Sequence, residues 1–102
     1  MVTIGLGSKI FSSGFDIKQK LQDNQRIDLA FSMQNLLGRI MSLPMPTMCA
    51  FNGHAVAGGL FLGLAHDFRA LKDKAFVSLS EIMIGVGMGP AWTQLLRHKL
   101  QP

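Results

Sequence analysis

Apolar residues recur at the spacing of a helix in residues 26–42. They stand at Leu29, Met33, Leu36, Leu37, Ile40 and Met41. This repeat of three to four residues predicts a helix with one apolar face. The run Leu-Pro-Met-Pro at residues 43–46 ends it, because proline has no amide donor and restricts the residue before it. Residues 47–51 form a short apolar run that predicts a buried strand.

Shorter apolar runs predict the remaining elements. Residues 2–5 form a strand, a helix starts at about Gly58, and residues 91–100 form a final helix. Two further strands, at 68–71 and 75–79, flank a Lys-Asp-Lys turn. Alternating strands and helices with right-handed crossovers predict an α/β fold, with a mostly parallel sheet and helices packed outside it.

A glycine turn leads directly into an apolar helix in residues 52–67. The first N–H groups of a helix lack intrahelical partners and lie at the positive end of its dipole. Gly58 and Gly59 are therefore candidate donors to an oxyanion. The alternative is that both glycines only permit close packing between a strand and the helix.

A second glycine turn lies in Phe-Ser-Ser-Gly-Phe-Asp-Ile at residues 11–17. Gly14 can adopt a φ that other residues tolerate poorly, and Asp16 can cap the next segment, which leaves the N–H of Phe15 pointing outward. If both turns face one pocket, Phe15 and Gly58 form a two-donor oxyanion hole. The alternative is a simple loop stabilised by serine and aspartate.

A third motif, Ser-Glu-Ile-Met-Ile-Gly at residues 80–85, completes an ordered set. In this order and spacing the three motifs resemble the crotonase superfamily, the enoyl-CoA hydratases and isomerases. The resemblance implies an α/β, crotonase-like (ClpP/crotonase) ββα spiral core. Family subunits are much longer than 102 residues. We therefore expect residues 1–102 to be one partial core domain, incomplete at both ends, from a fragment or a short paralogue.

The resemblance also implies roles for residues. The amides of Phe15 and Gly58 would bind the carbonyl oxygen of a coenzyme A thioester, and the loop bearing Phe15 would line its adenine end. The substrate contacts implied are Ser13, Gly14, Asp16, Ile17, Gly59 and Phe61. The thioester is the substrate, and no cofactor or metal is expected.

The carboxylates distinguish reactions within the family. Hydratases resemble one another in using two glutamates; Phe61 occupies the first position here and Glu81 the second. One carboxylate beside an oxyanion hole can move a proton from C2 to C4 of a 3-enoyl-CoA without water. The resemblance therefore implies a 3,2-enoyl-CoA isomerase of fatty-acid β-oxidation. Without the motif, Glu81 would simply be a solvated residue.

Residues 76–82, followed by Pro90-Ala91-Trp92, resemble the peroxisomal isomerases of plants and other eukaryotes. The family implies the matrix of a peroxisome or mitochondrion, and a homotrimer or hexamer for the complete protein. Two alternatives remain open. One is a catalytically inactive crotonase-like subunit that serves as an interaction component of a larger assembly; the weaker one is an enoyl-CoA hydratase.

The formal net charge of +4 raises the question of nucleic acid, but the basic residues are scattered and lack interleaved aromatic residues. A basic balance also fits a ligand with several phosphates. Lys9, Lys18 and Lys20 flank the loop that would meet coenzyme A, and ordinary solvation is an equal alternative for each. No apolar run is long enough to span a membrane. With 48% hydrophobic residues, the chain is expected to expose apolar faces when isolated.

Overall fold

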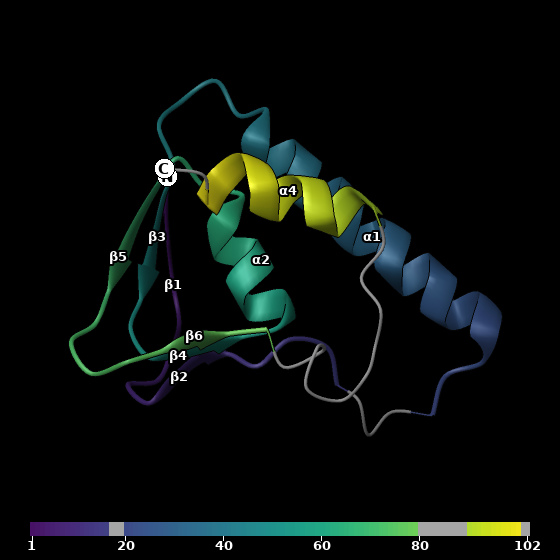
Figure 1. Cartoon of the computed structure of the whole chain (residues 1–102), viewed down its shortest axis with the longest axis horizontal. Coiled ribbons are helices and arrows are strands. Elements are labelled where there is room, and N and C mark those ends of the chain that lie inside the picture. Colours follow the sequence, from purple (N-terminus) through teal and green to yellow (C-terminus); the bar gives the residue numbers. More distant parts are fainter. Residues whose placement is uncertain (17–19, 80–89, 101–102) are drawn as a thin grey trace.

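A repeated order of two strands followed by a helix organises the chain (Figure 1). The computed structural model describes residues 1–16, 20–79 and 90–100. Its elements are β1 (Val2–Ile4), β2 (Ile10–Ser12), α1 (Asp23–Met41), β3 (Met48–Phe51), β4 (His54–Val56), α2 (Gly58–Leu64), β5 (Phe68–Leu71), β6 (Val77–Ser78) and α4 (Pro90–Leu100).

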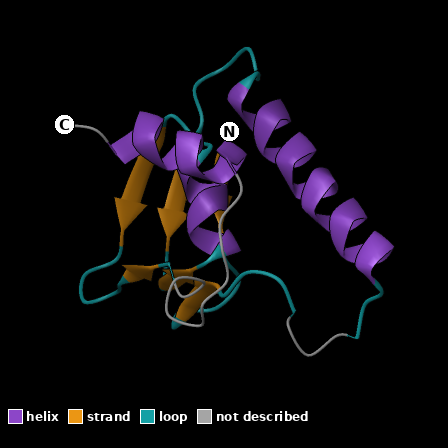
Figure 2. Cartoon of the chain, turned by 45° about the vertical axis from the view of Figure 1, so that its right-hand side comes forward, coloured by secondary structure: helices purple, strands orange, loops and turns teal. Residues whose placement is uncertain are grey.

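The strands divide between two parallel sheets that run in different directions (Figure 2). One sheet has the order β1-β3-β5 and the other the order β2-β4-β6. Each pair of consecutive strands therefore contributes one strand to each sheet, which is the predicted ββα spiral. The α/β class and the parallel pairing are confirmed. The residue pattern did not predict β2 and β4, because both strands overlap the stretches whose glycines indicate turns.

Helix α2 lies at the centre of the core. Its residues Leu60, Phe61 and Leu64 are buried, and the helix packs against β2, β3, β4 and α4. A side chain at Gly59 would overlap the backbone carbonyl of Ser12, so glycine is needed where the helix crosses β2. A helix enclosed on all sides is apolar all round, which explains why its sequence lacks a polar face.

Helix α1 begins earlier than the predicted residue 26, at Asp23. The side-chain oxygen of Gln25 accepts the backbone N–H of Gln22 at 2.9 Å, which satisfies one of the free donors at the helix start. Only Leu37 of this helix is buried, while Ile27 and Phe31 are exposed. Val2, Ile4 and Phe68 are exposed on the first sheet, so the expected apolar faces are present.

A reciprocal polar pair connects the starts of β3 and β5. Oδ2 of Asp67 accepts the backbone N–H of Thr47 at 2.9 Å and its hydroxyl at 3.2 Å, and the Asp67 N–H donates to the same hydroxyl oxygen at 2.9 Å. The backbone and then the hydroxyl hydrogen bond from Thr47 hold the pKa of Asp67 below its ordinary value. These bonds favour the ionised carboxylate. They therefore stabilise the fold at pH values above the ordinary pKa of an aspartate.

Replacing Asp67 with asparagine tests this pair. A depressed folded-state pKa stabilises the fold above the unfolded pKa of about 3.9, and the benefit disappears as the pH falls through the lowered value. We expect urea unfolding to show wild type more stable than Asp67→Asn at pH 6, with the difference shrinking below about pH 4. A difference that stays constant from pH 6 to pH 2 would contradict the assignment.

Candidate active site

The two glycine turns meet at one edge of the second sheet. Gly14 and Phe15 follow β2, and Gly58 follows β4, its parallel neighbour. The two backbones touch: a Cβ atom on Gly14 would lie 2.9 Å from the Gly58 nitrogen, and one on Gly58 would lie 3.9 Å from the Phe15 nitrogen. The structure therefore brings together the two amides that the sequence motifs single out.

The residues before these two amides have unusual backbone conformations. Gly14 has a φ of 92°, and its N–H is held by the Ser12 hydroxyl at 3.2 Å. Ala57, just before Gly58, has a φ of 58° and a ψ of −123°, a conformation that costs a residue with a Cβ about 1–3 kcal/mol. Within residues 1–16, 20–79 and 90–100, the N–H groups of Phe15 and Gly58 donate to no other group.

Phe15 and Gly58 both line a cavity of about 210 Å³. Its lining consists of Ser12, Gly14, Phe15, Met33, Leu36, Gly58 and Leu62. Gly14 and Gly58 can contribute only backbone to this lining, while Met33, Leu36 and Leu62 come from the apolar positions of α1 and α2. Backbone donors beside an apolar wall suit a polarised carbonyl that carries an apolar chain.

The other predicted site residues lie around or away from this cavity. Ser13 and Asp16 are exposed on the loop after β2 and do not line it. Gly59 is enclosed against the backbone of Ser12, as the packing alternative expected. Phe61 is 3% exposed in the core, where its ring meets Trp92 edge-on at 4.8 Å between centroids. Ile17 and Glu81 lie outside the described residues.

Three apolar residues of the cavity were not predicted as site residues: Met33 and Leu36 on α1 and Leu62 on α2. The helical repeat in α1 already marked Met33 and Leu36 as apolar-face residues. An apolar repeat predicts that one face of a helix is buried, but it does not say what packs against that face. The position of these two residues at the cavity could therefore not be predicted from the sequence.

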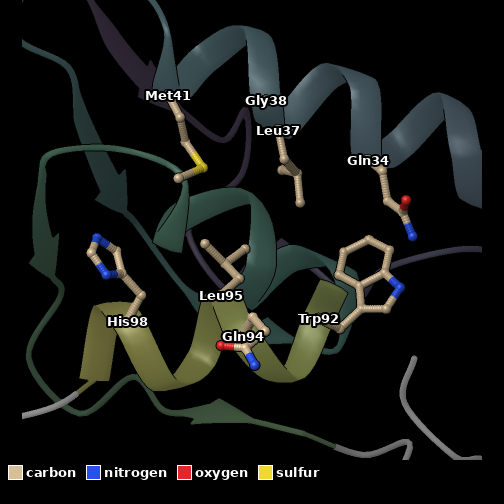
Figure 3. A pocket seen from close by; sticks show the side chains of 8 residues that line it. All are labelled: Gln34, Leu37, Gly38, Met41, Trp92, Gln94, Leu95 and His98. Carbon is tan, nitrogen blue, oxygen red and sulfur yellow. The ribbon is translucent and has the colours of Figure 1, made fainter. Parts of the chain in front are cut away.

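A separate, larger cavity of about 310 Å³ lies between α1 and α4. In Figure 3, Leu37 and Met41 extend from α1 toward Trp92 and Leu95 on α4. Neither glycine turn lines it, and the described residues around it carry no carboxylate. The smaller cavity is therefore the one that joins backbone donors to an apolar wall.

Metal and thiol chemistry find no support in the described residues. No group of three or more histidine, cysteine or acidic side chains lies close enough to hold a metal ion within them. Burial raises the pKa of the Cys49 thiol to about 11, which keeps it protonated and unreactive at neutral pH. No helix in the described part of the chain has the length and apolar character needed to cross a membrane.

Comparison with known proteins agrees with this geometry. Residues 1–101 match the enoyl-CoA hydratase/isomerase family. The chain belongs to this family. Peroxisomal enoyl-CoA delta isomerase 2 of Arabidopsis thaliana is 35% identical over 100 residues, covering 90% of the chain and 42% of the relative. Enoyl-CoA delta isomerase 3 of the same plant is 33% identical over 106 residues, covering 98% of the chain and 44% of the relative.

A solved structure of the family superposes closely. The crystal structure of an enoyl-CoA hydratase from Mycobacterium marinum has a TM-score of 0.90 and 34% identity, covering 99% of this chain and 44% of that one. Both delta isomerases and hydratases are thus similar to this member of the enoyl-CoA hydratase/isomerase family. The chain spans less than half the length of each of these relatives.

Substituting Gly14 with alanine should disrupt the paired amides of this family member. The new Cβ would require a strained φ and would press on the Gly58 nitrogen at 2.9 Å. Losing one oxyanion donor typically reduces kcat about a hundredfold or more. If the amides of Phe15 and Gly58 act as an oxyanion hole, turnover of an enoyl-CoA should fall by that order, while far-ultraviolet circular dichroism stays unchanged.

Gly38→Ala is the matched control, because a Cβ on Gly38 meets nothing within 4 Å and its backbone has no positive φ. This variant should keep full turnover. Equal turnover in the Gly14 and Gly38 variants would show that the approach of the two turns does not matter for the reaction.

Proposed function

We propose that this chain carries the core of a 3,2-enoyl-CoA isomerase of unsaturated fatty-acid β-oxidation, which shifts a 3-enoyl-CoA double bond to trans-2-enoyl-CoA. The observation that carries the proposal is that Phe15 and Gly58, whose N–H groups have no partner among the described residues, meet on a cavity with apolar walls. A thioester carbonyl fits the amides, and the adjacent carbons of its acyl chain fit the apolar side.

The reaction needs an oxyanion hole and one base. Removal of a proton from C2 of the 3-enoyl-CoA moves negative charge onto the thioester oxygen, where the N–H groups of Phe15 and Gly58 stabilise it. Glu81 accepts that proton and returns it to C4, so the double bond moves from C3–C4 to C2–C3 and no water is consumed. The loop residues Ser13, Gly14, Asp16 and Ile17 contact the coenzyme A part of the substrate.

The surroundings of Phe61 favour isomerisation over hydration. This residue matches the position of the first hydratase glutamate, and its ring is enclosed in the core against Trp92. A hydrocarbon ring at this position neither activates water nor exchanges a proton. Glu81 is then left as the acid-base group of the motifs, which suits a reaction that moves one proton between two carbons.

The proposal also covers the substrate, the cofactor requirement, the compartment and the oligomeric state. The coenzyme A thioester is the substrate, and the reaction needs no cofactor, because proton transfer changes no oxidation state overall. We place the complete protein in the matrix of a peroxisome or mitochondrion as a homotrimer or hexamer. The peroxisomal name of the isomerase relative supports the first of these compartments.

The experiment is an isomerase assay on the full chain with 3-enoyl-CoA, following formation of trans-2-enoyl-CoA. Glu81→Gln should lower turnover by about 10²–10⁴-fold, because the amide cannot carry the proton. Asp28→Asn, which neutralises an exposed acid on α1, is the matched control and should retain activity. Undiminished turnover in Glu81→Gln would refute the isomerase mechanism.

A second candidate is a catalytically inactive subunit of a larger assembly. The exposed apolar residues on β1 and β5, among them Val2, Ile4 and Phe68, favour it, because such faces are usually covered in a working protein. Isomerase turnover that depends on Glu81 would exclude this candidate. Addition of water to crotonyl-CoA would instead support the weaker alternative, an enoyl-CoA hydratase.

A further inference from the structure

A cavity of about 400 Å³ lies at the end of the second sheet opposite the candidate active site. Its lining comes from all three connections between the two sheets: residues 8–9 before β2, residues 53–54 at the start of β4, and residues 72–75 before β6. Because the three strands are parallel, these connections meet at the amino ends. Gly14, Phe15 and Gly58 lie past the carboxyl ends.

The lining is predominantly basic. It includes Lys9, Lys72 and Lys74, against one carboxylate, Asp73. The sequence pattern had placed Lys9 beside the coenzyme A loop, but β2 separates this lysine from that loop by about 10 Å, the length of a three-residue strand. Lys9 therefore belongs to this second cavity and not to the 210 Å³ cavity.

His54 adds a hydrogen-bond donor to the same lining. Its Nδ1 accepts the backbone N–H of Phe76 at 3.0 Å, and its ring stacks on that of Phe76 at 4.0 Å between centroids. With Nδ1 acting as acceptor, the neutral imidazole carries its proton on Nε2. The cavity is thus lined by three ammonium-bearing side chains and a side chain with a fixed N–H donor.

Two contacts hold the three connections between the sheets together. The Lys72 ammonium donates to the Ser8 carbonyl at 2.8 Å, which joins the first connection to the third. A side chain at Gly53 would overlap the backbone of Lys9, so the first and second connections also touch. The backbone that carries these groups is therefore in place before any ligand arrives.

Lys74 occupies a conformation that favours glycine. Its φ is 65°, in a turn closed by the Ala75 N–H and the Lys72 carbonyl at 3.1 Å. Glycine or asparagine would fill this position with less strain. A lysine here sacrifices backbone stability while adding charge to the cavity, which is typical of residues kept for binding.

We propose that this cavity binds the phosphate group of a soluble phosphorylated small molecule, at a site separate from the one that holds the thioester. Lysine ammonium groups are compact charges that suit phosphate oxygens, and charge-assisted hydrogen bonds are stronger than neutral ones. The single acid in the lining leaves an excess of positive charge for a dianion.

The test is a titration of the full ¹⁵N-labelled chain with inorganic pyrophosphate, at constant ionic strength maintained with potassium chloride. The amide chemical shifts of Lys9, His54 and residues 72–75 should move during the titration. Those of Phe15 and Gly58 should not. The double variant Lys9→Gln/Lys74→Gln should bind pyrophosphate more weakly, with a Kd at least about tenfold higher than that of wild type. Arg39→Gln, which removes an exposed cation on α1, should bind as wild type.

A second variant separates binding from folding. Lys74→Gly relieves the positive φ, so it should unfold at an equal or higher temperature than wild type and still bind pyrophosphate more weakly. The proposal is overturned by equal binding in Lys74→Gly and wild type, or by equal losses in Arg39→Gln and the double variant. Shifts confined to Phe15 and Gly58, or binding to anionic lipid vesicles without pyrophosphate binding, overturn it as well.

Discussion

The candidate active site depends on direct contact between two backbone segments, at Gly14 and Gly58, with no side chain between them. Both segments leave parallel strands of the same sheet, so their ends lie at one edge. Without a Cβ at either position, the backbones at Gly14 and Gly58 come into direct contact, which two amides that share one carbonyl oxygen would require. A side chain at Gly14 would press on the Gly58 nitrogen at 2.9 Å and separate the donors.

The rest of the fold maintains this contact. Helix α2 begins at Gly58 and is buried along most of its length, so the core fixes the position of one donor. The Ser12 hydroxyl holds the amide of Gly14 and so constrains the loop that carries the other. The strained Ala57 persists because both of its sides are fixed, by the pairing of its N–H with the Ser78 carbonyl and by the start of α2. Preorganised donors of this kind need no rearrangement when charge develops on the substrate.

Much of the fold could be predicted from the residues because periodicity and proline placement are local signals. The apolar repeat located α1 to within a few residues, and its early start depends on a glutamine side chain at its first turn. Strands β2 and β4 gave no such signal, and neither did the division of the strands between two sheets, since pairing partners lie far apart in the chain. The glycine motifs predicted that Phe15 and Gly58 would meet. They did not predict Met33, Leu36 and Leu62 around them, or that β2 would separate Lys9 from the loop.

We propose above all that the amides of Phe15 and Gly58 together bind the thioester carbonyl oxygen. The most direct measurement is a crystal structure of the intact protein with a non-reactive acyl-CoA analogue. We expect the carbonyl oxygen to lie about 2.7–3.1 Å from both backbone nitrogens, with the acyl chain against Met33, Leu36 and Leu62. A carbonyl oxygen beyond hydrogen-bond distance of both nitrogens, in a fully occupied site, would contradict it.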